Sequence, residues 1–380
     1  MLYNGGFILR GGHREGAGRK PKNDRKVAKN IYISNDLYKV ISELEIAHCR
    51  SFNQKCINLM SKGIEMVNKE DEKNNNKLKF IDLFAGIGGI RKGFEDENTV
   101  AVYSSEWDRF SQQTYKANYG VLPDGDITKV DAKDIPKHDV LLAGFPCQPF
   151  SMIGKREGFE HATQGTLFFD VLRIMQYHKP KMFLLENVVG LLTIQGGQTF
   201  QIIQESLKNI GYDVFYKVLD AQNFGLPQVR KRVIIVGFRN DLQIRNFDFP
   251  VGKDDSITIG SILEDHPSGY TISKHLQNNY LFKKDDGKPQ VVNSNSQIKV
   301  KTLVASYHKI QRLTGTFVED DETGLRLFSE LECKRLMGFP DDFIVPVSRT
   351  QMYRQFGNSV AVPMIKAVAD KMKQSYYSVV

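Results

Sequence analysis

A short apolar run that ends at glycine and proline constrains the fold of this chain most strongly. Residues 141–143 are apolar and predict a buried strand, and Gly144 and Pro146 then turn the backbone. Cys147 follows, and Pro149 limits its conformations further. Because α/β sheets place their chemistry at strand ends, the pattern predicts a thiol held in a stiff turn beside a reactive site. A purely structural cysteine in a tight turn is the alternative interpretation.

Length and composition are those of an ordinary globular protein. The 380 residues suffice for two or three domains, and 41% of them are hydrophobic and 25% charged. The four cysteines are scattered without ligand-like spacing, so we expect neither a disulfide framework nor a metal site. No apolar run is long enough to cross a bilayer, and we expect a cytoplasmic protein without membrane contact.

Positive charge is concentrated at the N-terminus. The formal net charge is +8, and residues 1–30 hold eight Lys or Arg against two acidic residues. This excess favours a polyanionic partner. Residues 1–28 also lack an apolar period, so we expect them to form a disordered basic arm.

A strand and two helices are predicted between residues 29 and 68. Residues 30–34 alternate as a strand, Ser34 or Asn35 can cap a first helix, and Ser51 can cap a second. Elements of this size cannot bury a core alone. A polar linker is predicted over residues 69–78.

The order of these elements resembles a ribbon-helix-helix module. That resemblance implies that two chains pair their strands and place the ribbon in DNA, with Asn30 and Tyr32 on the outward face. It therefore implies a possible homodimer and DNA contact through this module.

A glycine-rich turn predicts a cofactor site. Residues 79–84 form a strand pattern, residues 85–89 supply the turn, and a helix pattern begins at Ile90. Glu106 lies 20 residues after Gly86, an offset at which an acid typically binds ribose hydroxyls.

Three further residues extend this site. Trp107 could stack on an adenine, and Asp126 with Ile127 follows another turn and could contact the base. The glycine spacing does not fit the dinucleotide fingerprint, so we expect a nucleoside-bearing cofactor without a pyrophosphate.

Polar groups at other predicted strand ends suggest a second half of the site. Glu186 and Asn187 end an apolar strand, and a carboxylate held there could donate a proton. Arg230 and Arg232 precede the strand that begins at Val233. Taken singly, a salt bridge explains Glu186 equally well, and a solvated face explains the arginines. A last motif, residues 355–360, is predicted to open the final helix.

Together these motifs closely resemble the bacterial DNA cytosine-5 methyltransferases of restriction–modification systems. They follow the family's order from Phe80 to the C-terminus: residues 82–89, 106–107, 126–127, 145–151, 165–169, 186–188, 228–232, 332–333, 337–340 and 356–360. The resemblance implies a Rossmann-like, doubly wound α/β catalytic domain over residues 79–239 and a small target-recognition domain over 240–347. Residues 348–380 would return to the catalytic domain.

The resemblance also assigns roles to individual residues. Cys147 would add to C6 of cytosine, Glu186 would bind or protonate N3, and Asn187 would orient its loop. Arg232 would hold O2, and Arg230 would help to fix the Cys147 loop and the substrate. S-adenosylmethionine would be bound by thirteen residues: Phe84, Ala85, Gly86, Gly88, Gly89, Glu106, Trp107, Asp126, Ile127, Pro146, Leu167, Asn358 and Ser359.

Double-stranded DNA is the implied substrate, and the target base must be flipped out of it. Residues 149–165 resemble the family's mobile loop, in which Ser151, Lys155 and Arg156 would contact DNA. Residues 161–165 depart from the family pattern and lack one phosphate-binding arginine. In the target-recognition region the plausible DNA contacts are Thr302, Ser306, His308, Lys309, Gln311, Arg312 and Thr314, with plain polar surface as the alternative.

Three functions follow from these resemblances. The first is sequence-specific DNA cytosine-5 methylation that protects host sites from a cognate restriction endonuclease, a functional rather than a physical partner. The second is tRNA methylation, although the chain lacks the Cys-Phe-Thr tripeptide of those relatives. The third is transcriptional repression through the N-terminal module, which is compatible with catalysis.

Overall fold

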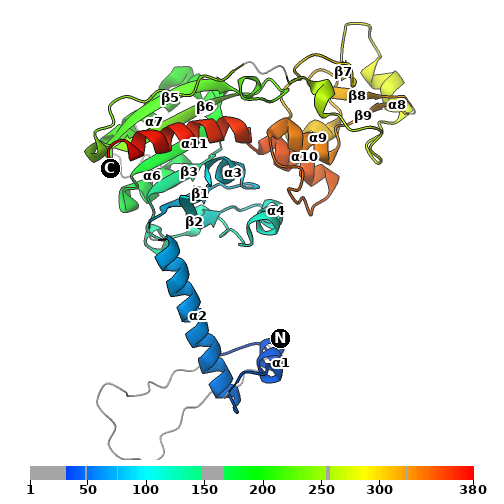
Figure 1. Ribbon diagram of the computed structural model, residues 1–380. Coiled ribbons are helices and arrows are strands. Elements are labelled where there is room, and N and C mark those ends of the chain that lie inside the picture. The colour runs from blue at the N-terminus through cyan, green and yellow to red at the C-terminus, as the bar shows by residue number, and fades with distance from the viewer. Residues whose placement is uncertain (1–30, 48, 75, 147–166, 254–256, 322) are drawn as a thin grey trace, which may run out of the picture. The chain divides into compact units, whose positions relative to one another are not determined.

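The computed structural model describes residues 31–47, 49–74, 76–146, 167–253, 257–321 and 323–380, and their side chains except those of residues 66–75 (Figure 1). The chain divides into two compact units, residues 1–76 and residues 77–380. Each unit is described by itself.

The first unit contains two helices, α1 (Asn35–Glu43) and α2 (Phe52–Asn74). Ser34 caps α1, since its hydroxyl accepts a hydrogen bond from the Leu37 N–H at 3.2 Å. At the start of α2, Ser51 Oγ accepts from the Gln54 N–H, and Gln54 Oε1 accepts from the Ser51 N–H. This reciprocal capping box fixes the start of α2 where the sequence predicts it.

Two predictions for this unit differ from the structure. Residues 31–34 form no strand, because no segment of the described residues lies beside them to supply a strand's hydrogen-bond partners. Helix α2 continues to Asn74, into the segment predicted as a linker. Residues 64–74 contain neither Gly nor Pro and are rich in Lys and Glu, so nothing in the sequence ends the helix earlier.

The second unit is built on a six-stranded sheet in the order β2-β1-β3-β4-β6-β5. β2, β1, β3 and β4 are parallel to one another, and β6 is antiparallel to both β4 and β5. The strands are β1 (Leu78–Leu83), β2 (Thr99–Ser105), β3 (Val140–Ala143), β4 (Met182–Val188), β5 (Tyr212–Asp220) and β6 (Lys231–Arg239). The α/β class predicted from the sequence is confirmed.

Helices cover both faces of the sheet: α3 (Gly89–Phe94) and α11 (Val362–Tyr377) on one, α6 (Leu167–His178) and α7 (Gln198–Asn209) on the other. Strand residues alternate between these layers. Val140 and Leu142 pack with α11, whereas Leu141 and Ala143 pack with α6. The continuous apolar run of β3 is therefore buried on both sides, and its carboxyl end opens toward the site. Figure 1 shows α11 running across the sheet beside α3.

A small lobe, defined here as residues 259–358, has its own apolar core. It contains a second sheet in the order β7-β8-β9, and Figure 1 shows this sheet with α9 and α10 at one end of the unit. Its elements are β7 (Gln290–Val292), β8 (Thr316–Asp320), β9 (Gly324–Arg326), α8 (Lys274–Leu276), α9 (Glu330–Met337) and α10 (Arg349–Asn358).

Helix α4 (Arg109–Tyr119) and several short turns complete the unit. Short 3₁₀ segments cover Ile127–Lys129, Ala132–Asp134, Val189–Leu192, Ile194–Gly197, Ala221–Asn223, Asn240–Leu242, Ile259–Ile262 and Tyr307–Lys309, and a π-helical turn covers Gln277–Leu281.

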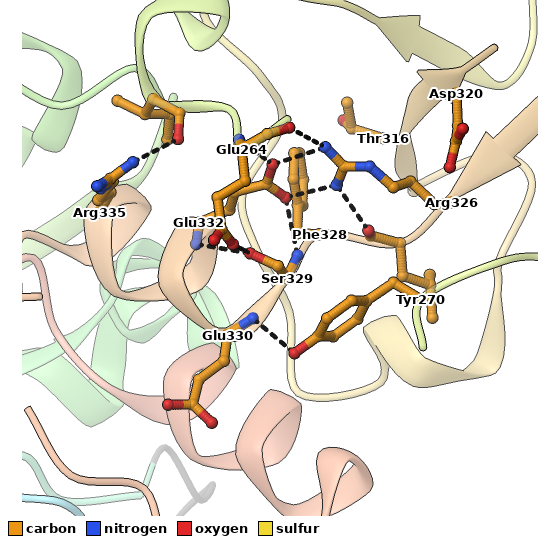
Figure 2. A network of polar contacts seen from close by, with 12 residues as sticks. Glu264, Tyr270, Thr316, Asp320, Arg326, Phe328, Ser329, Glu330, Glu332 and Arg335 are labelled. Atoms are coloured by element: carbon orange, nitrogen blue, oxygen red, sulfur yellow. Dashed lines mark hydrogen bonds and ion pairs between the residues drawn. The ribbon is translucent and has the colours of Figure 1, made fainter. Parts of the chain in front are cut away.

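A buried ion pair joins α9 to β9 in the small lobe (Figure 2). Arg326 Nη1 and Nη2 each lie 2.8 Å from an oxygen of Glu332, and the Ser329 N–H donates to Glu332 at the same distance. The carboxylate of Glu264 contacts the Ser329 hydroxyl, so a distant loop is fixed to the same helix start. Because the carboxylate and the guanidinium each have hydrogen-bond partners, the ion pair fixes the geometry of the lobe without leaving a buried charge unpaired.

The chain returns from the small lobe to the six-stranded sheet later than residue 348, where the return was predicted. Helix α10 packs into the small-lobe core, and only α11 packs on the six-stranded sheet. Residues 355–358 end α10, and the final helix begins at Val362, after residues 355–360, which were predicted to open it. Pro363 explains this start, because proline is tolerated in the first turn of a helix.

Candidate active site

A cavity of about 890 Å³ lies at the carboxyl ends of β1, β2, β3 and β4. This is where an open α/β sheet reverses its strand order and binds ligands. Twelve of the thirteen residues predicted to bind the cofactor line it: Phe84, Ala85, Gly86, Gly89, Glu106, Trp107, Asp126, Ile127, Pro146, Leu167, Asn358 and Ser359. The remaining residue, Gly88, does not line the cavity.

The glycines of the turn after β1 have different physical roles. Gly88 has a φ of 81°, and a Cβ added there would lie 2.3 Å from the Tyr119 ring. A Cβ at Gly89 would lie 2.5 Å from Ser359 Oγ, so both positions need glycine for close packing. Gly86 has a φ of 56°, but a Cβ there would meet nothing within 4 Å. Its lack of a side chain leaves space in the cavity.

Acidic and aromatic groups follow at the end of β2. Glu106 is buried, and its carboxylate accepts the Gly86 N–H at 2.7 Å and the Asp108 N–H at 2.8 Å. Burial raises the pKa of Glu106, although these backbone N–H groups oppose the shift. Trp107 is 81% exposed and lies along the cavity. A carboxylate beside an aromatic ring suits a ribose diol and an adenine, so these residues fit a nucleoside.

Asp126 also lines the cavity. Its carboxylate accepts hydrogen bonds from the Thr128 hydroxyl at 2.8 Å and from the Thr128 N–H at 3.1 Å. These bonds lower the pKa of Asp126, which therefore carries a negative charge at neutral pH.

Glu186 and Arg232 form an ion pair on the cavity wall. Arg232 Nε lies 2.9 Å from Glu186 Oε1, and Glu186 is only 8% exposed. Burial raises the pKa of Glu186, while the charges of Arg232 and Arg230 oppose the shift. Glu186 therefore forms a salt bridge and also faces the cavity, where it could act on a substrate. The two interpretations offered by the sequence do not exclude each other.

Asn187 connects this pair to the turn after β3. Its Nδ2 donates to the Phe145 carbonyl oxygen at 2.8 Å, and Asn187 Oδ1 accepts the Val188 N–H at 2.8 Å. Pro146 follows Phe145 and lines the cavity. The chain segment that leads to Cys147 is therefore fixed to the end of β4.

Comparison with known proteins agrees with this arrangement. The family model for C-5 cytosine-specific DNA methylases matches residues 78–374. The chain belongs to this family. It is accordingly a DNA cytosine-5 methyltransferase, and S-adenosylmethionine is the general methyl donor of the family.

Individual relatives extend the match. The chain is 59% identical to the type II methyltransferase M.BsuFI of Bacillus subtilis over 96% of this chain and 97% of that one. It is 55% identical to M.MspI of Moraxella sp over 81% of this chain and 74% of that one. Its fold resembles the S. pombe Dnmt2 methyltransferase, with a TM-score of 0.63 and 21% identity over 78% of this chain and 99% of that one.

Arg230 does not face the cavity, contrary to the expectation that it contacts the substrate. Its side chain is 1% exposed and donates to the carbonyl oxygens of Leu303 at 2.9 Å, Gly357 at 3.0 Å and Ser359. Burial lowers the pKa of Arg230 to about 9, and the charge of Arg232 acts in the same direction. Arg230 therefore positions the two backbone segments that form one wall of the cavity.

The prediction for Arg312 is also wrong. It is predicted to contact DNA, but it is 5% exposed, and its guanidinium donates to Asp286 and to the Leu281 carbonyl at 2.8 Å. The side chain is fully used inside the small lobe and is not available to a base. Lys309, by contrast, is exposed, and so is Tyr32 in the first unit.

Several predicted site residues lie outside the described residues: Cys147, Ser151, Lys155, Arg156 and Asn30. Within the described residues, no group of three or more His, Cys, Asp or Glu side chains is placed to hold a metal ion. No helix in the same ranges has the length and apolar character needed to cross a membrane.

The sequence interpretation missed two charged residues. Arg354 of α10 lines the cavity, and only its helix position, one turn before Asn358, could have indicated it. Asp82 of β1 is fully buried, and neither of its oxygens has a hydrogen-bond partner among the described residues. Burial raises the pKa of Asp82 to about 8, against the lowering effect of Arg91. An acid inside an otherwise apolar strand was the available signal for Asp82.

Proposed function

We propose that this protein methylates cytosine at C5 within a specific sequence of duplex DNA, using S-adenosylmethionine and a transient covalent bond between Cys147 and C6. One observation carries the proposal. The Glu186–Arg232 pair and the nucleoside-type wall of Glu106 and Trp107 line the same cavity. The chain enters the predicted nucleophile turn at Pro146, on that cavity's wall.

The cofactor-binding residues hold the nucleoside and leave room for its reactive end. Glu106 would accept hydrogen bonds from the ribose and Trp107 would stack on the adenine, and Gly86 leaves the space that a side chain would occupy. When bound, S-adenosylmethionine supplies an electrophilic methyl group on a sulfonium. Asn358 and Ser359 also line the cavity, and Arg230 holds their segment through the Gly357 and Ser359 carbonyl groups.

Glu186 and Arg232 would activate the cytosine ring. Burial raises the pKa of Glu186 above its ordinary value, which favours the protonated form that can donate to N3. Arg232 has donors beyond the Nε that binds Glu186, and these suit O2. Both contacts withdraw electron density from the ring, which favours addition of a nucleophile at C6.

Cys147 would supply that nucleophile. Its thiolate would add to C6, and the ring electrons would then form a bond from C5 to the methyl group while the bond between that methyl group and the donor's sulfur breaks, so that the donor leaves as a neutral thioether. A base removes the C5 proton, the ring electrons expel the sulfur from C6, and aromatic cytosine is restored. Free thiols have a pKa near ~8.5, so the site must assist deprotonation of Cys147. The target base reaches the cavity only after it leaves the duplex.

A covalent-trap experiment tests this mechanism. Duplex DNA with 5-fluorocytosine at the target should form a stable adduct with the wild-type protein in the presence of S-adenosylmethionine, because fluorine cannot leave as the C5 proton does. Cys147→Ala should form none and should transfer no methyl group. Full turnover by Cys147→Ala would refute the covalent mechanism, and methylation of tRNA in preference to duplex DNA would refute the substrate.

The biological setting belongs to the same proposal. M.BsuFI and M.MspI are described as type II methyltransferases, and the identity of 59% to the first covers almost the whole chain. We therefore infer a role in a restriction–modification system in the cytoplasm, with a cognate endonuclease as functional partner. Bisulfite sequencing of DNA from cells that express the protein should show one methylated sequence context; scattered methylation without a common context would contradict sequence specificity.

A second function is favoured by the apolar surface of the first unit. Large apolar side chains are exposed on both of its helices: Leu37 and Val40 on α1, Leu44 directly after it, and Ile57, Met60 and Ile64 on α2. Two helices cannot bury a core alone, and a second copy of the unit would cover these side chains. We infer a homodimer that binds operator DNA and represses its own operon.

Sedimentation and footprinting test this second function with the full chain. The wild type should sediment as a dimer and protect a site in its upstream DNA, and Val40→Asp should lose both properties while it keeps methylation activity. A monomeric wild type, or the absence of any protected upstream site, would remove the idea.

A further inference from the structure

The cavity has an uneven distribution of charge. Among the described residues that line it, four are acidic, Glu106, Asp108, Asp126 and Glu186, and two are basic, Arg232 and Arg354. Arg232 is paired with Glu186 at 2.9 Å. A DNA phosphate that approaches the cavity would therefore meet mostly negative charge. Its approach requires a cation that compensates this charge.

Arg354 is the cation that remains. Among the described residues no carboxylate forms an ion pair with it, and its one hydrogen bond is a long contact of 3.4 Å from Nη1 to Gln351 Oε1. The side chain is exposed although it lines the cavity, so its guanidinium lies at the mouth rather than in the interior. The other guanidinium donors of Arg354 have no acceptor within the ranges that the structure describes.

The helix that carries Arg354 is held in place by its neighbours, so the position of the Arg354 side chain at the cavity is well defined. The neighbouring Met352, Tyr353 and Phe356 are buried in the small-lobe core. Gln355 is held at the other side by the Thr114 hydroxyl at 3.0 Å, which joins α10 to α4. Arg354 therefore projects from a helix fixed to both parts of the unit.

We propose that Arg354 binds a backbone phosphate of the DNA strand that contributes the flipped cytosine. This inference rests on the proposed function. A guanidinium can bind two phosphate oxygens at once, and such contacts fix the register of a protein on DNA without reading sequence. Exposure favours a phosphate outside the cavity over the carboxylate of an enclosed methyl donor. Arg354 thus holds the target nucleotide's backbone while the base occupies the cavity.

The salt dependence of DNA binding tests this proposal. The affinity of the full-length protein for a target duplex is measured between 50 and 200 mM salt for wild type, Arg354→Gln, Arg354→Lys and Lys371→Gln. Lys371 lies on α11, is exposed and does not line the cavity, so its variant removes the same charge elsewhere. Each phosphate contact contributes about 0.9 to the log–log slope. We expect Arg354→Gln to lower that slope by about 0.9 and Arg354→Lys to restore it, with Lys371→Gln unchanged.

Kinetics and cofactor binding separate the alternatives. We expect Arg354→Gln to raise the KM for DNA about tenfold, with kcat and the calorimetric Kd for S-adenosylmethionine unchanged. Weaker binding of S-adenosylmethionine but not of its decarboxylated analogue, with a normal salt slope, would overturn the proposal in favour of the cofactor carboxylate. An unchanged slope and KM would overturn it outright. An inactive wild type would contradict the proposed function instead.

Discussion

Asn187 of β4 donates from Nδ2 to the carbonyl oxygen of Phe145, 2.8 Å away and 42 residues earlier in the chain. The bond is buried and joins the end of β4 to the residue before Pro146. It connects the strand that carries Glu186 with the turn that leads to Cys147.

Replacement of Asn187 should therefore slow catalysis more than it weakens cofactor binding. Asn187→Leu leaves the buried Phe145 carbonyl without a donor, at a cost of about 1–3 kcal/mol. If this free energy displaces the turn that leads to Cys147, the rate of methyl transfer should drop about ten- to hundredfold. Single-turnover rates with pre-bound S-adenosylmethionine measure it; a variant with wild-type rates would show that the bond has no positioning role.

The acid–base state of Glu186 should be visible in the pH profile. Burial raises the pKa of this carboxyl, so the protonated form persists to higher pH and is lost as pH rises through that value. A single-turnover profile should show this loss on its alkaline side. Glu186→Gln is always neutral and cannot protonate N3, so we expect a rate at least about a hundredfold lower and no titration from this group. Persistence of the same limb in the variant would assign it to another residue.

Asp82 should make stability depend on pH. Its pKa is about 8 in the folded protein against an ordinary 3.8, so between these values the folded state holds a proton that the unfolded state has lost. The free energy of unfolding must then fall as pH rises from about 4 to 8, by at most about 1.4 kcal/mol per pH unit.

Asp82→Asn should flatten that dependence. Urea unfolding at pH 5, 6, 7 and 8 measures it, with the wild type as reference. The groups that interact with Asp82 include Arg91, Glu95 and Glu106, so Glu95→Gln is a suitable control for a surface charge. An equally steep profile in Asp82→Asn would show that the buried carboxyl is not the source.

Two alanine substitutions in the turn after β1 should behave differently. Gly88→Ala places a Cβ 2.3 Å from the Tyr119 ring, and we expect a loss of stability of about 1–3 kcal/mol. Gly86→Ala meets no atom but keeps a φ of 56°, which costs about 1 kcal/mol. Its methyl group intrudes on the cavity, so calorimetry should show weaker cofactor binding. A larger loss of stability in Gly86→Ala, together with weaker cofactor binding in Gly88→Ala, would contradict these roles of the two glycines.

The sequence predicted best those features that depend on neighbouring residues. The glycine turn and the caps at Ser34 and Ser51 follow from local backbone chemistry and occur as predicted. Glu106 lines the cavity, and its contact with a ribose stays a prediction. The ion pair of Glu186 and Arg232 joins residues 46 positions apart, and the motifs located both partners without showing that they touch.

Burial of long cations was not predictable in the same way. The family resemblance implies that Arg230 helps to fix the Cys147 loop and the substrate and that Arg312 contacts DNA, and a solvated surface is the alternative for both. Each is instead enclosed by carbonyl oxygens from distant segments, such as Leu303 for Arg230 and Leu281 for Arg312. The sequence contains no local signal for an acceptor that tertiary folding supplies, and this limits any assignment of DNA contacts from charge alone.

The reversed direction of β6 has a geometric consequence for the chemistry. Because β6 runs against β4, its first residues meet the last residues of β4, and Arg232 stands opposite Val188, two positions from Glu186 and on the same side. In a wholly parallel sheet the start of β6 would lie at the far edge, about 20 Å away for a strand of this length. A slip of one residue in the pairing would turn Arg232 toward the other layer of helices. The hairpin of β5 and β6 thus sets the distance between the Glu186 carboxyl group and the Arg232 guanidinium, and sequence changes in its loop reach the reaction through strand register.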